Sequence, residues 1–118
     1  MDEFVVPETV IEIVDRAFQR TSLENLTIPD GVKLIGKEAF ESSNLRSINI
    51  GAGVQEIGGD SFLWCPMMES INVDKNNEHF CSVDRVLYNK GKTRLIACPQ
   101  NVKAPKLPRG LDLSLIHI

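Results

Sequence analysis

The chain has 118 residues, of which 42% are apolar, and its formal net charge is −3. This length suits one domain or a piece of one, and the negative charge argues against a nucleic-acid partner. No apolar run approaches the roughly 18 residues of a membrane-spanning helix, so we expect no membrane insertion. Met1 is followed by two acidic residues and no continuous apolar run, so we expect no signal peptide within this chain.

A sequence repeat occupies the first part of the chain. Residues 6–18 recur at 28–40 and again at 50–62, a period of 22, after which one insertion makes the period 23. A coil of this length cannot bury its own apolar edge, so we expect coils at about 4–27, 28–49 and 50–73 to stack over a shared core. The apolar columns of this core are Val6/Ile28/Ile50/Val73, Val10/Val32/Val54, Ile13/Ile35/Ile57, Phe18/Phe40/Phe62, Leu23/Leu45/Met68 and Leu26/Ile48/Ile71.

Each coil contains the signals of a strand, a turn and a bend. Residues 45–50 read Leu-Arg-Ser-Ile-Asn-Ile and end in alternating polarity, which predicts a short strand, and its copies one period apart predict a parallel sheet. Pro29-Asp30-Gly31 has the composition of a turn. Residues 36–40 are too few for an independent helix, so we expect a single helical turn or a bend that carries Phe40 inward.

The repeat is interrupted after Val73. Residues 74–78 form a polar loop, residues 83–88 and 93–98 read as strands, and residues 89–92 read as the turn between them. We therefore expect a β-hairpin insert over residues 74–99. The repeat resumes at 107–111, where Leu-Pro-Arg-Gly-Leu overlays Ile-Pro-Asp-Gly-Val, so a further coil begins there.

The C-terminal hexapeptide does not fit the repeat. Residues 113–118 read Leu-Ser-Leu-Ile-His-Ile, which resembles translated sequencing-adapter sequence, and Ser114 stands where the repeat requires Ile. We expect this tail to be non-native and the reading frame to be truncated. Phe4 falls in the Leu26 column, so we also expect Met1 to begin partway through a coil.

The repeat unit resembles the BspA-like leucine-rich repeat, which reads I-P-x-x-V-x-x-I-x-x-x-A-F-x-x-C-x-x-L-x-x-I-x-I. Residues 51–73 match its longer form with Cys65 in the cysteine position, whereas Thr21 and Ser43 occupy that position in the earlier copies. The insert also resembles a hairpin of this family, with Arg85 where glycine is frequent. The resemblance implies a leucine-rich-repeat solenoid, α/β to mainly β, over residues 1–111, and a place in a cell-surface or secreted protein.

The alternation of the strands predicts a polar surface. Between the apolar positions, the intervening side chains should point to solvent and stand side by side in successive strands. Solenoid proteins use such faces for recognition, and the alternative is an ordinary solvated sheet. The predicted partner-binding residues are Glu24, Asn25, Thr27, Arg46, Ser47, Asn49, Glu69, Ser70 and Asn72.

Other candidate sites have weaker patterns. Asp74-x-Asn76-x-Glu78 departs from a calcium loop at both its sixth and its twelfth position, so we expect a polar turn. His79 and Cys81 lack a third orienting group for nucleophilic catalysis. Trp64 and Tyr88 are candidates for aromatic partner contacts, against simple packing. Cys65, Cys81 and Cys98 match no metal or redox spacing, so we expect reduced, structural cysteines.

The charge is unevenly distributed along the chain. Residues 1–84 carry 15 acidic and 6 basic side chains, a net charge of −9, whereas residues 85–118 carry 1 acidic and 7 basic side chains, a net charge of +6. The basic part could mark an anionic partner such as a sulfated glycan, but two solvated faces of opposite sign is the interpretation we favour.

These observations lead to one functional hypothesis and one alternative. By resemblance, we expect a non-catalytic repeat module of a cell-surface adhesin that binds a host or matrix protein or a glycan, with no cofactor and no metal. The alternative is a structural spacer of a large surface protein with no binding role of its own. In both cases neighbouring repeats of the full-length chain are partners in stacking.

Overall fold

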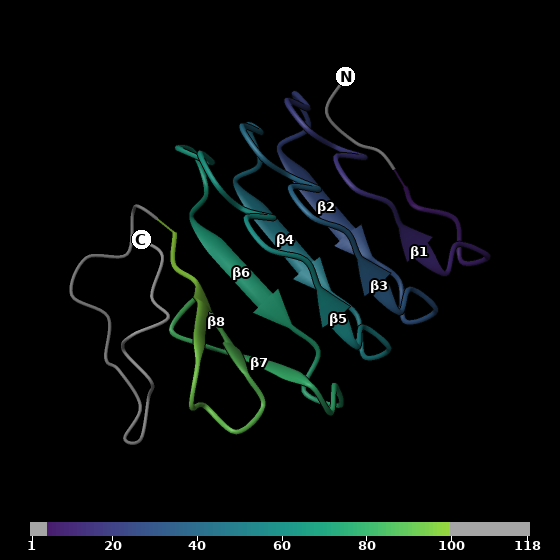
Figure 1. The fold of residues 1–118 in the computed structure, drawn as a ribbon, viewed down its shortest axis with the longest axis vertical. Coiled ribbons are helices and arrows are strands. Elements are labelled where there is room, and N and C mark those ends of the chain that lie inside the picture. Colours follow the sequence, from purple (N-terminus) through teal and green to yellow (C-terminus); the bar gives the residue numbers. More distant parts are fainter. Residues whose placement is uncertain (1–4, 100–118) are drawn as a thin grey trace.

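The computed structural model describes residues 5–99 and arranges them in three small β-sheets (Figure 1). No helix occurs among these residues, and so none that could cross a membrane. The fold is therefore mainly β. The strands are β1 (Glu12–Ile13), β2 (Asn25–Ile28), β3 (Leu34–Ile35), β4 (Ser47–Ile50), β5 (Glu56–Ile57), β6 (Ser70–Val73), β7 (Phe80–Val83), β8 (Val86–Asn89) and β9 (Leu95–Ala97).

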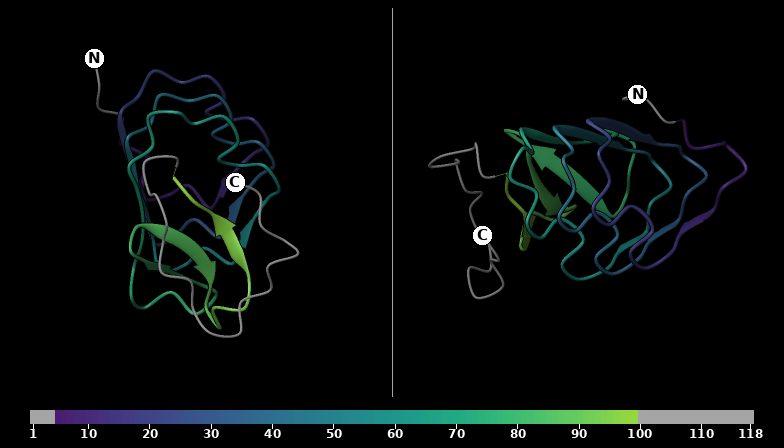
Figure 2. Two further views of the ribbon diagram at one scale, coloured as in Figure 1. Left: turned by 90° about the vertical axis from the view of Figure 1, so that its left-hand side faces the viewer. Right: turned by 90° about the horizontal axis from the view of Figure 1, so that it is seen from above.

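Two of the sheets are parallel and follow the repeat. In the sheet β2–β4–β6, Leu26 pairs with Ile48 and Ile48 with Ile71, so neighbouring strands are offset by one period of the repeat. The sheet β1–β3–β5 pairs Ile13 with Ile35 and Ile35 with Ile57. The predicted parallel sheet is confirmed, and the second one was not anticipated. Seen along the row of strands, successive windings of the chain lie one behind another (Figure 2).

The core lies between these two sheets and consists of matching side chains from successive windings. Phe40 is fully buried, and its ring stacks on Phe18 at 5.7 Å and on Phe62 at 5.4 Å between ring centroids. Leu26, Ile48 and Ile71 are each at most 2% exposed. Burial of one such side chain contributes about 1.5–3 kcal/mol, so the columns are the main source of stability.

The segment that carries Phe40 inward is a bend and not a helical turn. Phe18 N donates to Ala39 O at 2.8 Å, and Phe40 N donates to Ser61 O at 2.9 Å. Alternate N–H groups thus bond to the next winding, which is incompatible with the i→i−4 bonding of a helix. The left-handed backbone conformation recurs at two positions of this bend in every repeat, at Arg16, Glu38 and Asp60 and at Arg20, Ser42 and Trp64.

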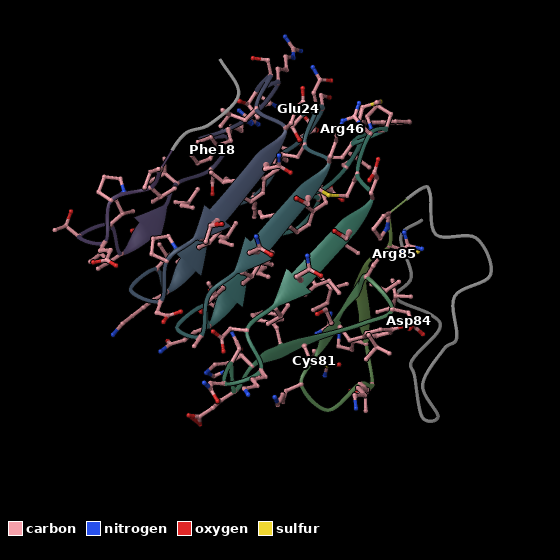
Figure 3. All side chains as sticks on the ribbon, turned by 180° about the vertical axis from the view of Figure 1, so that it is seen from behind. Phe18, Glu24, Arg46, Cys81, Asp84 and Arg85 are labelled. Atoms are coloured by element: carbon pink, nitrogen blue, oxygen red, sulfur yellow. The ribbon has the colours of Figure 1, made fainter. Side chains whose placement is uncertain are left out.

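The insert is a three-stranded antiparallel sheet, β7–β8–β9, in which β8 and β9 form the expected hairpin. The strand predicted over residues 83–88 is not continuous: Val83 ends β7, a turn follows, and residues 86–88 belong to β8. Asp84 and Arg85 have φ values of 51° and 71° and form a tight turn between β7 and β8 (Figure 3). Two consecutive residues with positive φ suit the right-handed twist of a two-residue hairpin. The sequence hides this turn because neither residue is glycine or asparagine. The expected second strand is confirmed as β9.

The insert also closes the free edge of β6. Ile71 N donates to Arg85 O at 3.1 Å, and Val73 N donates to the hydroxyl of Ser82 at 3.0 Å. These bonds occupy two N–H groups that would otherwise be open to another strand. The side chain of Asn77, fully buried, joins the insert to the preceding turn by donating to Gly51 O and Val54 O.

Several sequence-based expectations lie outside the described residues. They concern Phe4, the further coil at 107–111 and the tail at 113–118.

Candidate binding face

The nine predicted partner-binding residues lie on the outer side of the sheet β2–β4–β6 or directly before its strands. In β2 and β4 the burial alternates, so that Leu26 and Ile28 face the core while Asn25 and Thr27 face outward. The register then brings residues of the three strands into rows. We call this surface the polar face; it consists of Glu24, Asn25, Thr27, Arg46, Ser47, Asn49, Glu69, Ser70 and Asn72.

An ionic row crosses the start of the three strands. Arg46 Nε lies 3.5 Å from Glu24 Oε1, and Arg46 Nη1 lies 3.6 Å from Glu69 Oε2; Glu24 and Arg46 are labelled in Figure 3. All three side chains are about half exposed. Solvent screening makes such pairs worth little stability, on the order of 0–1 kcal/mol each. The three charged side chains are therefore only weakly held to one another and remain exposed to solvent.

Two further rows carry amides and hydroxyls. Asn72 Nδ2 donates to Asn49 Oδ1 at 3.3 Å, and Asn49 Nδ2 donates to Thr27 Oγ1 at 3.4 Å. In the adjacent row Ser47 Oγ donates to Asn25 Oδ1 at 2.7 Å. These bonds hold short side chains side by side at the spacing of the strands, about 4.8 Å. The face offers donors and acceptors at regular intervals.

A groove of about 810 Å³ adjoins the polar face where β2, β4 and β6 end. Asn25, Thr27, Asn49 and Asn72 of the polar face line it, so the groove and the face are continuous. The acidic residues of the groove are Glu8, Asp30 and Asp74. The sequence analysis did not assign them to a site, although Glu8 and Asp30 occupy the same position of the repeat, directly after a proline.

The loop after β6 is held by a hydrogen bond between one of its side chains and its own backbone. Asp74 Oδ1 accepts from the backbone N–H of Asn76 at 2.8 Å, which forms a local turn. Within residues 5–99, no group of three His, Cys, Asp or Glu side chains is placed to hold a metal ion. His79 is exposed, and the thiol of Cys81 donates to Asn89 O at 3.5 Å, so the two side chains do not form a nucleophile–base pair there.

Cys65 belongs to the core. Its thiol donates to Phe40 O at 3.0 Å and lies 3.4 Å from the hydroxyl of Ser43, which occupies the same position one repeat earlier. Burial raises the pKa of the Cys65 thiol, and the hydrogen bonds from Ser43 partly oppose that shift. Burial also raises the pKa of the Cys98 thiol. Such thiols are weak nucleophiles near neutral pH.

The two aromatic candidates differ in exposure. Trp64 is 65% exposed, and Leu63 and Met67, which are close to it in the sequence, are exposed as well. Tyr88 is fully buried in the insert, so of the two interpretations given for it simple packing holds and partner contact does not. The alternation of β8 turns Tyr88 into a small apolar cluster with Val86 and Leu95, and burial raises the pKa of its hydroxyl.

Comparison with known proteins finds a matching family model and similar solved structures. The family model of the BspA type leucine rich repeat region (6 copies) matches residues 1–104. A leucine-rich repeat protein from Eubacterium ventriosum is 29% identical with a TM-score of 0.82, over 88% of this chain and 28% of that chain. A leucine rich cell surface protein from Faecalibacterium prausnitzii is 32% identical with a TM-score of 0.82, over 94% and 30%.

A third structure is a more distant match. The pneumococcal vaccine antigen PcpA is 28% identical with a TM-score of 0.60, over 86% of this chain and 32% of that chain. The chain thus spans less than a third of each of these three structures. No protein with a curated description matches it.

Proposed function

The chain belongs to the BspA-type leucine-rich repeat family, and from that premise we propose that it is a non-catalytic binding module of a cell-surface protein. Two observations support the location: one similar structure is a leucine rich cell surface protein, and another is a vaccine antigen. Within that protein, the module is a segment of a solenoid whose coils follow the period of the repeat, at about 4–27, 28–49 and 50–73, with the insert at 74–99. Neighbouring repeats of the longer chain stack on it.

The polar face is the surface that we assign to binding. Its rows place polar or charged side chains about 4.8 Å apart, in a register that the parallel strands fix. A rigid array of this kind loses little conformational entropy when a partner binds. We propose that the partner is a host or matrix protein or a glycan, and that the module works as part of an adhesin.

Binding assays on a matched pair of variants test this function. The chain is passed over immobilised matrix proteins and mucin, together with the variants Asn49→Arg and Asn44→Arg. Both asparagines are exposed, but only Asn49 lies on the polar face. We expect at least one surface to bind the chain and to lose about tenfold in affinity with Asn49→Arg only, because an arginine there covers the neighbouring rows. Absence of binding to every surface would refute the function, and equal effects of both variants would refute the location.

One observation favours the alternative role as a structural spacer. The side chains of the polar face bond to one another, as in the chain from Asn72 through Asn49 to Thr27. Such internal bonds stabilise neighbouring strands by about 0.2–1 kcal/mol per pair without any partner. A spacer predicts that replacing Asn49 with alanine lowers stability and leaves the attachment of cells expressing the full-length protein unchanged.

A further inference from the structure

The groove beside the polar face has an apolar floor and lies at one edge of the sheet. The strands β2, β4 and β6 end on the same side of the molecule (Figure 1), and the loops that follow them form the wall of the groove. The apolar surface of this floor comes from Val5, which is 83% exposed, and from the partly exposed Pro29 and Val73. Ile28 and Ile50 lie beneath it and are each only 1% exposed. The groove thus runs across the strands and parallel to the row of windings.

The charges along this groove have one sign. Glu8, Asp30 and Asp74 are exposed, and the lining residues include no lysine, arginine or histidine. The polar face differs, because there Arg46 lies between two glutamates. Asp30 Oδ1 accepts from Ala52 N at 2.9 Å, and Asp74 Oδ1 likewise accepts from a backbone N–H, so both carboxylates are held in position.

The spacing of the carboxylates matches a polypeptide better than a single ion. Glu8 and Asp30 lie in consecutive loops, and Asp74 lies two loops beyond Asp30. With about 4.8 Å per strand, the three positions extend over about 14 Å. An extended chain covers that length with about four residues, at about 3.3–3.6 Å each. Within the described chain no three such groups are close enough to bind one cation.

We propose that this groove binds an extended segment of a protein partner that carries lysine or arginine side chains along about four residues. The inference rests on the proposed function and names the chemistry of the partner. The carboxylates attract the cationic ends, while the apolar floor packs against the aliphatic stems of those side chains. A sulfated or carboxylated glycan would meet charges of its own sign in the groove.

Fluorescence anisotropy with a labelled octa-lysine peptide tests this proposal on the whole chain. The variant Glu8→Gln/Asp30→Asn/Asp74→Asn removes the three charges and keeps the side-chain oxygens that accept backbone hydrogen bonds. The matched control Glu12→Gln/Glu56→Gln/Asp60→Asn removes three exposed carboxylates outside the groove. We expect the groove variant to bind at least about tenfold more weakly and the control to bind within about twofold of the unchanged chain.

The results separate this proposal from the proposed function. Equal losses in both variants, or no binding of octa-lysine to the unchanged chain, would overturn the groove as a basic-peptide site. The same variants are then tested on the surface that binds the chain. Loss of that binding with Asn49→Arg but not with the groove variant contradicts the groove and leaves the function intact. Binding of octa-lysine in the groove with no matrix or mucin binding contradicts the function alone.

Discussion

Replacing Asn77 with alanine should greatly destabilise the fold, because this one side chain joins the insert to the repeat. Asn77 is fully buried and lies between the turn after β4 and the start of β7. Its Nδ2 donates to Gly51 O at 2.9 Å and to Val54 O at 3.1 Å. Its Oδ1 accepts from His79 N at 2.7 Å and from Phe80 N at 2.8 Å. The amide group is thus used completely by backbone partners.

The magnitude follows from these four bonds. A hydrogen bond contributes about 0.5–1.5 kcal/mol net to stability, so the loss of four amounts to about 4 kcal/mol. This is a large share of the 5–15 kcal/mol or so that stabilises a typical domain. With a denaturant slope of about 1.5 kcal/mol per molar urea, the unfolding midpoint should fall by about 2.5 M.

Urea unfolding followed by far-ultraviolet circular dichroism measures this effect. Asn76→Ala is the matched control, since Asn76 is exposed and bonds in this loop only through its backbone N–H. We expect the control to change the free energy of unfolding by less than about 0.5 kcal/mol. A loss below about 1 kcal/mol with Asn77→Ala, or equal losses in both variants, would refute the argument that Asn77 connects the two parts.

Three further predictions concern the core, a thiol and the tight turn. Phe40→Ala should cost about 3–5 kcal/mol in urea unfolding because its ring is buried between two others, and a cost below that of Phe18→Ala would contradict the stacking. Burial raises the pKa of Cys65, so the folded state favours the protonated thiol; this contribution to the free energy of unfolding is complete below the ordinary thiol pKa and is lost as the pH rises through the raised value. Between about pH 7 and 10 the unchanged chain should therefore lose more stability than Cys65→Ala. Equal losses in the two proteins would contradict this. Arg85→Gly should stabilise the fold by about 0.5–1 kcal/mol and so raise the thermal unfolding midpoint, because φ at this position is 71° and glycine adopts positive φ without steric cost. A lower midpoint would show that the weak hydrogen bond from Arg85 to Glu69 O matters more.

The periodic part of the structure could be predicted from the sequence because each column repeats the same requirement. The matches Leu26/Ile48/Ile71 and Phe18/Phe40/Phe62 report both which residues are buried and which strands pair. The polar face follows from the same register, since alternation along a strand fixes which side chains face outward. Its geometry was therefore predictable from the sequence, whereas a partner for it was not.

The non-periodic features could not be predicted in the same way. The turn at Asp84 and Arg85 lies within an apparently continuous β-rich segment. Aspartate adopts positive φ more readily than most residues, but Arg85 stands where a glycine would have marked the turn. Asn77 looks like any polar loop residue, because its importance comes from the carbonyl groups of Gly51 and Val54, which lie in the preceding repeat. The repeat could have placed Glu8 beside Asp30, because both follow a proline at the same position, but Asp74 stands one position earlier in its repeat and does not fit that column.

Hydrogen–deuterium exchange on the free chain and on its complex with a bound matrix protein or mucin can locate the contact surface. If the polar face mediates binding, the amides of β2, β4 and β6 and of the loops that end them gain protection, while those around Trp64 do not. Protection confined to the segment around Leu63, Trp64 and Met67, with β4 unchanged, would contradict the assignment of the polar face.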